Sequence, residues 1–379
     1  MELFKAEREA AEIFPPGEFI KDELEARGWS QVDLAEILGR HPNQVNKIIQ
    51  GTQAITPETA KQLADAFGTS AQLWLNLESA YQLSQITVDT NAVARRAKLF
   101  DTFPVREILR RGWVETSENI SVLEKRFLDF FDIKSLDERP TFAHAARRPP
   151  TAQDYSAMWA WLRRARQLAP AINAGKFSNT SLKEAFDRLR LLIHDIEEAR
   201  HVPRILSEAG IRLVIVETLP RTKMDGATFW LNRWSPVVVL SLRYDRIDGF
   251  WHTLLHELDH VKNREGMVEP VVDSDLVGEN MQPFADKPEV EKRADRFACE
   301  FSIKKGELDN FIARSRPMYS KQRIYLFARR LHVHPGIVVG QLQFRGVIDY
   351  KHNREMLDKV RHVVTASALT DGWGNTPPV

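Results

Sequence analysis

The stretch WHTLLHELDHVKNREG, residues 251–266, places two histidines four residues apart with a glutamate directly after the first. The apolar residues around it recur at helical spacing, which predicts an amphipathic helix. On one face of such a helix, the imidazoles of His256 and His260 can reach the same metal ion. Glu257 lies one step round the helix, where it can act as a base on water without binding the metal. The stretch therefore predicts two ligands and the base of a zinc hydrolase site.

A short pattern of this kind often arises by chance, so a third ligand has to support it. A metzincin would carry glycine at position 263 and histidine at position 266, but the sequence has Asn263 and Gly266, which excludes that class. The alternative is a carboxylate on a later helix, and PEVEKRADRFACEFSI (288–303) has the apolar spacing of a helix. On that helix, Glu291 can complete a His₂Glu site. Asp295, four residues on, can accept a hydrogen bond from the far nitrogen of a ligand histidine.

Other residues compete for these roles. Glu291 taken alone would be a solvated charge on a helix, and Glu279, Glu289 and Glu300 are rival ligands. His252 lies one turn before the pair of histidines, but no second glutamate follows it, so we expect it to pack rather than to bind metal.

The composition limits the class of protein. With 379 residues, 43% hydrophobic and 28% charged, the chain is typical of a globular protein of two or three domains. Its single cysteine, Cys299, excludes a disulfide framework and a multi-cysteine zinc finger, and fits a reducing cytoplasm. There is no apolar run of about 18 residues and no signal-peptide core, so we expect neither a membrane partner nor secretion. The expectation is a cytoplasmic protein whose metal ligands are histidine and carboxylate.

The net charge of +1 conceals an uneven distribution. Residues 1–85 carry 7 Lys and Arg against 13 Asp and Glu, or −6, and residues 86–210 carry 21 against 17, or +4. The remainder carries 25 against 22, or +3. This balance argues against a protein that coats nucleic acid through its overall charge.

Turn and helix signals divide the chain into four parts. Residues 1–85 predict five short helices, and residues 86–205 predict a helical connecting region in which RRPPT (147–151) is the candidate hinge. Residues 206–315 contain the candidate metal ligands. Residues 316–379 predict C-terminal helices followed by a loose tail.

From residue 211 the helical spacing gives way to short stretches of apolar and β-branched residues, which predict a small sheet. GIRLVIVETLP and SPVVVLSL are rich in β-branched residues, and GATFWLN lies between them. Turn residues separate the three, which indicates short antiparallel strands. VVVLSL, 237–242, is the candidate edge strand for pairing with an extended peptide. The predicted fold class is mostly α with a small antiparallel β-sheet.

Strands, a helix with HELDH and then EVEKRADRFACEFSI resemble the ImmA/IrrE-type metallopeptidases over about residues 205–305. The resemblance implies a gluzincin-like α+β metallopeptidase domain, with Zn²⁺ on the two histidines and Glu291 and with Glu257 as the catalytic base. It also implies a protein substrate, such as a repressor, a toxin partner or the chain itself. Asp259 stands where that family usually has glycine, and it adds a negative charge beside the site.

The stretch WSQVDLAEILGRHPNQVNKIIQG, residues 29–51, has the form of a helix-turn-helix. Gln31 opens the first helix, Ala35 is small where the helices cross, and Gly39 makes the turn. A helical bundle without a nucleic-acid role is the alternative, because polar residues on an exposed face are ordinary and this segment is acidic. The outward residues of the second helix that can bond base edges or phosphates are Asn43, Gln44, Asn46 and Lys47.

PPGEFIKDELEARGWSQVDLAEILG, ITPETAKQLADAFGTS and LWLNLESAYQL together look like the HigA/VapI-type antitoxins of the Xre-like helix-turn-helix class, over roughly residues 15–84. The resemblance implies an N-terminal five-helix DNA-binding domain, a homodimer on operator DNA and a toxin partner. Pro42 replaces the usual polar residue near the start of the recognition helix and removes one possible base contact.

Three hypotheses follow. The first is an antitoxin-type transcriptional regulator with a fused zinc metallopeptidase domain that hydrolyses a protein. The second is a DNA-binding antitoxin without catalysis, whose zinc site is structural or senses a ligand. The third is a peptidase whose helix-turn-helix only docks protein partners.

Overall fold

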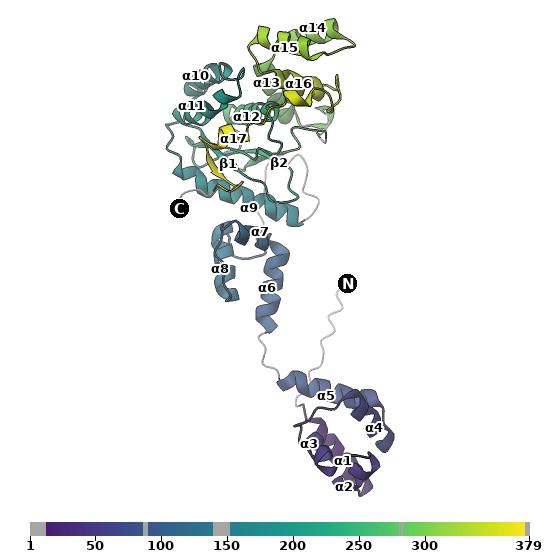
Figure 1. Cartoon of the computed structure of the whole chain (residues 1–379). Helices are drawn as coiled ribbons and strands as arrows, with labels where there is room; N and C mark the ends of the chain where they lie inside the picture. Colours follow the sequence, from purple (N-terminus) through teal and green to yellow (C-terminus); the bar gives the residue numbers. More distant parts are fainter. Residues whose placement is uncertain (1–12, 86–89, 139–151, 280, 282–283, 376–379) are drawn as a thin grey trace. The chain divides into compact units, whose positions relative to one another are not determined.

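The chain forms two compact units, Met1–Val93 and Ala94–Val379 (Figure 1). The candidate hinge at 147–151 lies outside the residues that the structure describes. In this computed structural model, those residues are 13–375 without 86–89, 139–151, 280 and 282–283.

Five complete helices make up the described part of the first unit, as the sequence predicts. Ser30 and Thr56 each accept a hydrogen bond from the backbone N–H three residues on and so begin two of the helices. Gly28 and Gly68 end two of them in left-handed backbone conformation. The helices are α1 (Pro16–Arg27), α2 (Gln31–Ile37), α3 (Pro42–Ile49), α4 (Pro57–Phe67) and α5 (Ala71–Gln85).

An apolar core holds the helix-turn-helix pair, α2 and α3, in the first unit. Ala35 of α2 is fully buried, and Val45, Ile48 and Ile49 anchor α3 to the same core. α1 packs so closely on α3 that a Cβ at Gly17 would lie 1.9 Å from the carbonyl oxygen of Ile49. This packing leaves the opposite side of α3 free for its polar side chains.

The second unit is built around a five-stranded mixed sheet. Its strands are β1 (Arg212–Val216), β2 (Met224–Trp230), β3 (Pro236–Leu240), β4 (Val271–Ser274) and β5 (Leu369–Asp371). They lie in the order β4-β2-β3-β1-β5, in which β1 pairs parallel with both β3 and β5. β2 pairs antiparallel with β3 and β4. The prediction of an antiparallel sheet is therefore wrong, because two of the strand pairs are parallel. The three strands expected from the sequence are present as β1, β2 and β3.

The connections explain the mixed pairing. β2 turns directly into β3, with the N–H of Leu231 donating to the carbonyl of Ser235 at 3.0 Å, so these two strands form a hairpin. β1 takes the other side of β3 and runs parallel to it. The expected edge strand at 237–242 is therefore central, and the sheet ends in β4 and β5. β5 comes from the segment expected to be a loose tail.

Helices cover both faces of this sheet (Figure 1). α12 (Ile247–Lys262) packs on β2 and β3, α9 (Ala152–Leu168) packs on β1, and α13 (Glu289–Ser302) lies along α12. Ala294 and Ala298 of α13 are small and buried, which lets α13 approach α12 closely. The other α-helices from residue 90 onward are α6 (Thr90–Thr102), α7 (Val105–Arg110), α8 (Ile120–Phe131), α10 (Asn179–Arg190), α11 (Val202–Glu208), α14 (Lys305–Ser315), α15 (Lys321–Leu331), α16 (Pro335–Phe344) and α17 (Arg361–Thr365).

Across the described parts of both units, no helix combines the length and the apolar character that crossing a bilayer requires.

Candidate metal centre and polar helix

Four side chains from three elements converge between α12, α13 and β4. His256 and His260 come from α12, Glu291 from α13 and Asp273 from β4, and each offers a ligand atom within 4.8 Å of the other three. All four residues are buried, with at most 1% of their surface exposed. The structure thus brings together the three residues expected as ligands from the sequence and places a fourth candidate ligand, Asp273, beside them.

The distances from the two histidine nitrogens to the two carboxylate oxygens suit a tetrahedral metal site. Nε2 of His256 lies 3.1 Å from Oε2 of Glu291 and 3.5 Å from Oδ2 of Asp273. Nε2 of His260 lies 3.9 Å and 3.5 Å from the same two oxygens. A zinc ion with four bonds of about 2.0 to 2.1 Å separates its ligand atoms by about 3.3 Å. The residues present therefore fit zinc.

The far nitrogens of both histidines are held by carboxylates. Nδ1 of His256 donates to Asp295 at 3.0 Å, and Nδ1 of His260 donates to Glu265 at 2.6 Å. Asp295 is held in place by Lys287, whose Nζ donates to it at 2.6 Å. These bonds fix the protons on Nδ1 and turn the lone pairs of both Nε2 atoms toward Asp273 and Glu291.

Several atoms of the cluster lack a hydrogen-bond donor among the described residues. They include Nε2 of His260, one oxygen of Glu291 and both oxygens of Asp273. Acceptors that are buried and face one another cost several kcal/mol unless a cation or protons lie among them. A divalent metal ion supplies that compensation, which is a second reason why these residues suit a metal.

The two histidines bind protons strongly as well. Burial disfavours the imidazolium of His260, but the Asp273 carboxylate beside Nε2 and the hydrogen bond from Nδ1 to Glu265 raise its pKa to about 10. Burial also opposes protonation of His256, and the Asp273 carboxylate, with Asp295 and Glu291, raises the pKa of His256 well above its ordinary value. Because protons and a metal ion compete for the same nitrogens, metal binding weakens as the pH falls.

Asp273 is the residue that the sequence analysis missed. It lies on a strand of four residues, between the two helices that carry the other ligands, and no spacing rule links it to either helix. The one signal available was the pattern VVDSD at 271–275, in which an acidic residue follows a short β-branched run. A buried strand that ends in carboxylates can be recognised in the sequence. The register of that strand against β2 cannot be predicted from the sequence.

The expected base, Glu257, is fully buried beside the cluster. Its Oε2 accepts a hydrogen bond from Oγ1 of Thr228 at 2.7 Å, and its Oε1 has no donor among the described residues. The carboxylate fits only because β2 has a glycine there, since a Cβ at Gly226 would lie 2.2 Å from Oε1. Burial, followed by the charge of Asp273, raises the pKa of Glu257 well above its ordinary value.

The remaining acidic candidates lie outside the cluster. Glu279, Glu289 and Glu300 are exposed. Asp259 is buried but faces Arg293, whose Nε donates to it at 2.7 Å, so its charge is compensated away from the ligands.

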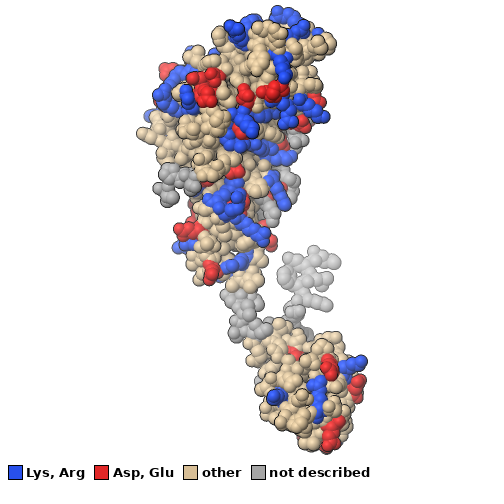
Figure 2. All heavy atoms as spheres, viewed as in Figure 1, with Lys and Arg blue, Asp and Glu red and all other residues tan. Residues whose placement is uncertain are grey.

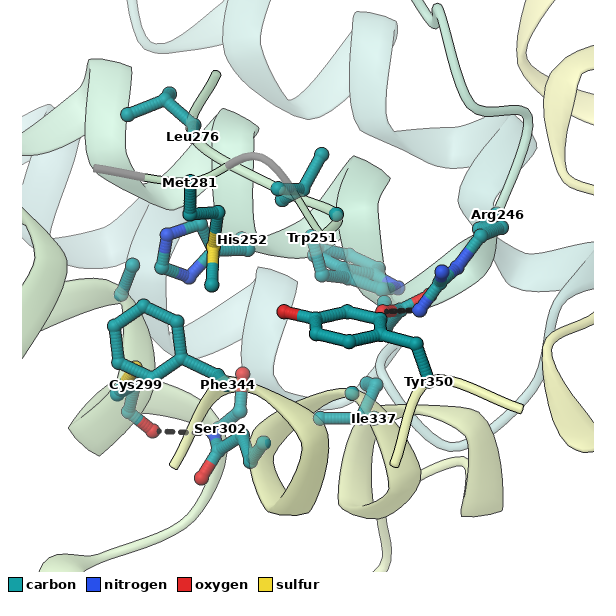
Figure 3. Close-up of a pocket in the computed structure, with 16 residues that line it drawn as sticks. Arg246, Trp251, His252, Leu276, Met281, Cys299, Ser302, Ile337, Phe344 and Tyr350 are labelled. Carbon is teal, nitrogen blue, oxygen red and sulfur yellow. Dashed lines mark hydrogen bonds and ion pairs between the residues drawn. The ribbon is translucent and has the colours of Figure 1, made fainter. Parts of the chain in front are cut away.

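A small pocket adjoins the centre through His252. Nε2 of His252 lies 3.4 Å from Asp295, and Figure 3 shows its ring beside Met281 and Phe344. Cys299 also lines this pocket, where burial, together with the charge of Asp295, raises the pKa of the thiol to about 12. His252 therefore does more than pack, because it contacts the carboxylate that orients a ligand histidine.

In the first unit, the side chains expected to contact DNA lie at the surface. Gln31 at the start of α2 and Asn43, Gln44 and Lys47 on α3 are exposed, whereas Asn46 is half-buried. His41 caps α3 by accepting a hydrogen bond from the N–H of Asn43 at 3.3 Å. On the face that Figure 2 shows, basic and acidic side chains of this unit are interspersed.

Comparisons with known proteins concern a fifth of the chain. Residues 20–74 match the helix-turn-helix family, within the first unit. Virulence-associated protein I of Dichelobacter nodosus is 37% identical over 79 residues, which are 21% of this chain and 73% of that protein. The uncharacterized HTH-type transcriptional regulator YddM of Escherichia coli (strain K12) is 33% identical over 82 residues, 21% of this chain and 87% of that protein. Antitoxin HigA-1 of Vibrio cholerae is 40% identical over 68 residues, 18% of this chain and 64% of that protein.

Proposed function

Because the chain belongs to the helix-turn-helix family that includes virulence-associated protein I and HTH-type transcriptional regulators, we propose that it is a DNA-binding transcriptional regulator of the antitoxin type. A homodimer places two copies of α3 in successive major grooves of an operator, with half-sites about 34 Å apart. The second unit binds one zinc ion and interacts with a protein, either a toxin partner or a substrate.

The observation that carries the proposal is the exposed polar side of α3. Asn43 and Gln44 lie in its first turn and are free of the core, which is where recognition helices carry their base contacts. Lys47 follows one turn later and suits a phosphate. Since residues 1–85 carry a net charge of −6 (7 basic against 13 acidic residues), non-specific attraction to DNA is weak and specific contacts must supply the affinity.

A fluorescence-anisotropy titration of the full chain against its own promoter and against scrambled DNA, at two salt concentrations, tests this function. We expect a clear preference for the promoter and a shallow salt dependence. Gln44→Ala should lose about 1–3 kcal/mol at one base pair and relax the sequence preference there. Gln82→Ala, at an exposed position of α5, is the matched control and should bind like the wild type. No preference for the promoter in the wild type would contradict the regulator function.

Zinc-dependent hydrolysis of a protein is the second candidate function. It is favoured by Glu257, which stands directly after a ligand histidine with one carboxylate oxygen unoccupied by any described donor. A zinc ion bound at this centre would polarise a peptide carbonyl and lower the pKa of water. Thr228 would hold the Glu257 carboxylate through Oε2, and Oε1 would accept the proton from water.

The test of hydrolysis is a comparison of the wild type with Glu257→Gln. The variant should keep its zinc, because Glu257 is not a ligand, and should lose all cleavage of the chain itself and of proteins encoded beside it. Glu300→Gln, at an exposed position on α13, is the control. Equal cleavage by wild type and Glu257→Gln would exclude Glu257 as the base. Absence of cleavage in both, with zinc bound, would favour a regulator whose metal is structural or senses a ligand.

A further inference from the structure

The position of Asp273 raises the question of what the fourth ligand does to the site. β4 is the end strand of the sheet and pairs with β2 so that Asp273 stands opposite Gly226. Gly226 has no side chain, and the carboxylate of Glu257 occupies the space above it. Asp273 thus reaches the cluster from the side of the sheet edge, close to the base.

A comparison within the same segment shows that Asp273 is unusual. Asp225 and Asp275 are also buried, but both pair with Arg243, at 3.0 Å for Asp225 and 3.2 Å for Asp275. Among the described residues, the basic atoms nearest to Asp273 are the Nε2 atoms of His256 and His260, both 3.5 Å away. Of these three carboxylates, only Asp273 has an oxygen close to the candidate ligand atoms of His256, His260 and Glu291.

The number of protein ligands decides what a zinc site can do. Catalytic sites have three protein ligands and leave one position open to water and substrate, whereas structural sites are closed by four. Here the distances from Asp273 to the two histidine nitrogens are close to the edge of a tetrahedral zinc site. They fit that edge no worse than the distances from Glu291 to the same nitrogens. Asp273 therefore has the geometry to fill the position that a catalytic site keeps open.

Resting on the metal site proposed above, we propose that Asp273 is the fourth protein ligand of the metal and that β4 holds the site closed. In this form the metal is bound but inaccessible to water or to a peptide carbonyl. Hydrolysis requires that β4 withdraw Asp273, and a regulator without catalysis keeps it in place. The closed site therefore gives the zinc a latent or structural role in the resting protein.

Cobalt substitution tests this proposal without relying on activity. Co²⁺ bound to the full-length protein gives visible absorption bands that change when a ligand is exchanged, and azide serves as a probe for an open position. We expect the wild type to bind about one Co²⁺ and its spectrum to be unaffected by azide. Asp273→Ala should bind Co²⁺ at least about tenfold more weakly, and azide should change its spectrum.

Two further variants keep the test decisive. Asp273→Asn preserves the shape of the side chain and should also weaken Co²⁺ binding, even if Asp273→Ala fails to fold. Asp275→Asn makes the same change of charge two residues away on the same segment and should leave the wild-type spectrum and its insensitivity to azide intact.

The two proposals fail differently. If the wild type binds no metal, the metal site itself is wrong. If the wild type binds Co²⁺ but responds to azide, or if both Asp273 variants keep the wild-type spectrum and affinity, the metal site stands and the role of Asp273 is overturned.

Discussion

The two candidate functional regions use polar side chains in opposite ways. On α3, Gln44 and Lys47 are exposed, so water satisfies them and they cost the fold nothing. In the metal centre, Asp273 and the ligand histidines are buried, and their unpaired atoms are costly until a cation joins them. The function of a surface site can therefore be tested only by adding its binding partner. In a buried site, the unpaired charges themselves indicate the kind of ligand that must bind there. The predictions below separate the two regions by changing one and measuring both.

Among the variants that leave the four candidate ligands intact, the largest effect is expected from Asp295→Asn. Asp295 accepts the Nδ1 proton of His256, and loss of its charge weakens this ligand, so zinc affinity should fall about 10- to 100-fold. Competition with a chelator of known affinity gives the ratio. Asp309→Asn, at a half-buried position of α14 away from the cluster, should retain full affinity, and promoter binding should be the same in both variants. Unchanged zinc affinity in Asp295→Asn would show that this hydrogen bond does not support the metal.

Gly226→Ala should destabilise the second unit by about 1–3 kcal/mol, because the new methyl group overlaps Glu257. Hydrogen exchange of peptides that cover β2, β4 and α12 measures the loss. In Gly306→Ala the added Cβ meets nothing within 4 Å, which makes it the matched control. Peptides from the first unit should exchange as in the wild type in both proteins. Wild-type protection in Gly226→Ala would mean that Glu257 does not occupy the space above β2.

Ser30→Ala removes the capping box of α2, in which Ser30 and Asp33 each accept a hydrogen bond from the other's backbone N–H. The cost should be about 1 kcal/mol. It should appear as faster exchange of amides in α2, with no change in α12 or α13. Ser84→Ala, at an exposed position near the end of α5, should leave α2 unaffected. A loss of protection in both units would contradict their description as separate bodies.

Lys47→Ala should have the smallest effect. A phosphate contact carries no sequence information, so binding should weaken equally on promoter and scrambled DNA, and the salt slope should fall by about 1. Lys305→Ala, in the second unit, is the control. If Lys47→Ala changed the preference between the two DNAs, the residue would be a base contact instead.

The sequence predicted the elements whose signals are local. Caps such as Ser30 and Thr56 and the apolar spacing around the HELDH stretch placed the helices. The spacing of Glu291 and Asp295 placed both on one side of α13, where the structure has them contact His256. These predictions succeed because a helix fixes the relative direction of side chains that are a few residues apart.

The features that could not be predicted from the sequence depend on pairing between distant segments. The parallel alignment of β1 with β3 and β5 follows from which strand lies beside which, and β5 comes from more than 150 residues after β1. Asp273 reaches the cluster only through the register of β4 on β2, which includes an irregularity between Met224 and Gly226. No local pattern encodes either arrangement.

Zinc analysis of the purified full-length protein tests the central claim, that a buried cluster in the second unit holds a metal. Native mass spectrometry should show about one zinc per chain in the wild type and in Glu300→Ala, whose side chain is exposed on the same helix as Glu291. Glu291→Ala should contain none. Full zinc retention by Glu291→Ala, or a wild type free of zinc after incubation with the metal, would contradict the account.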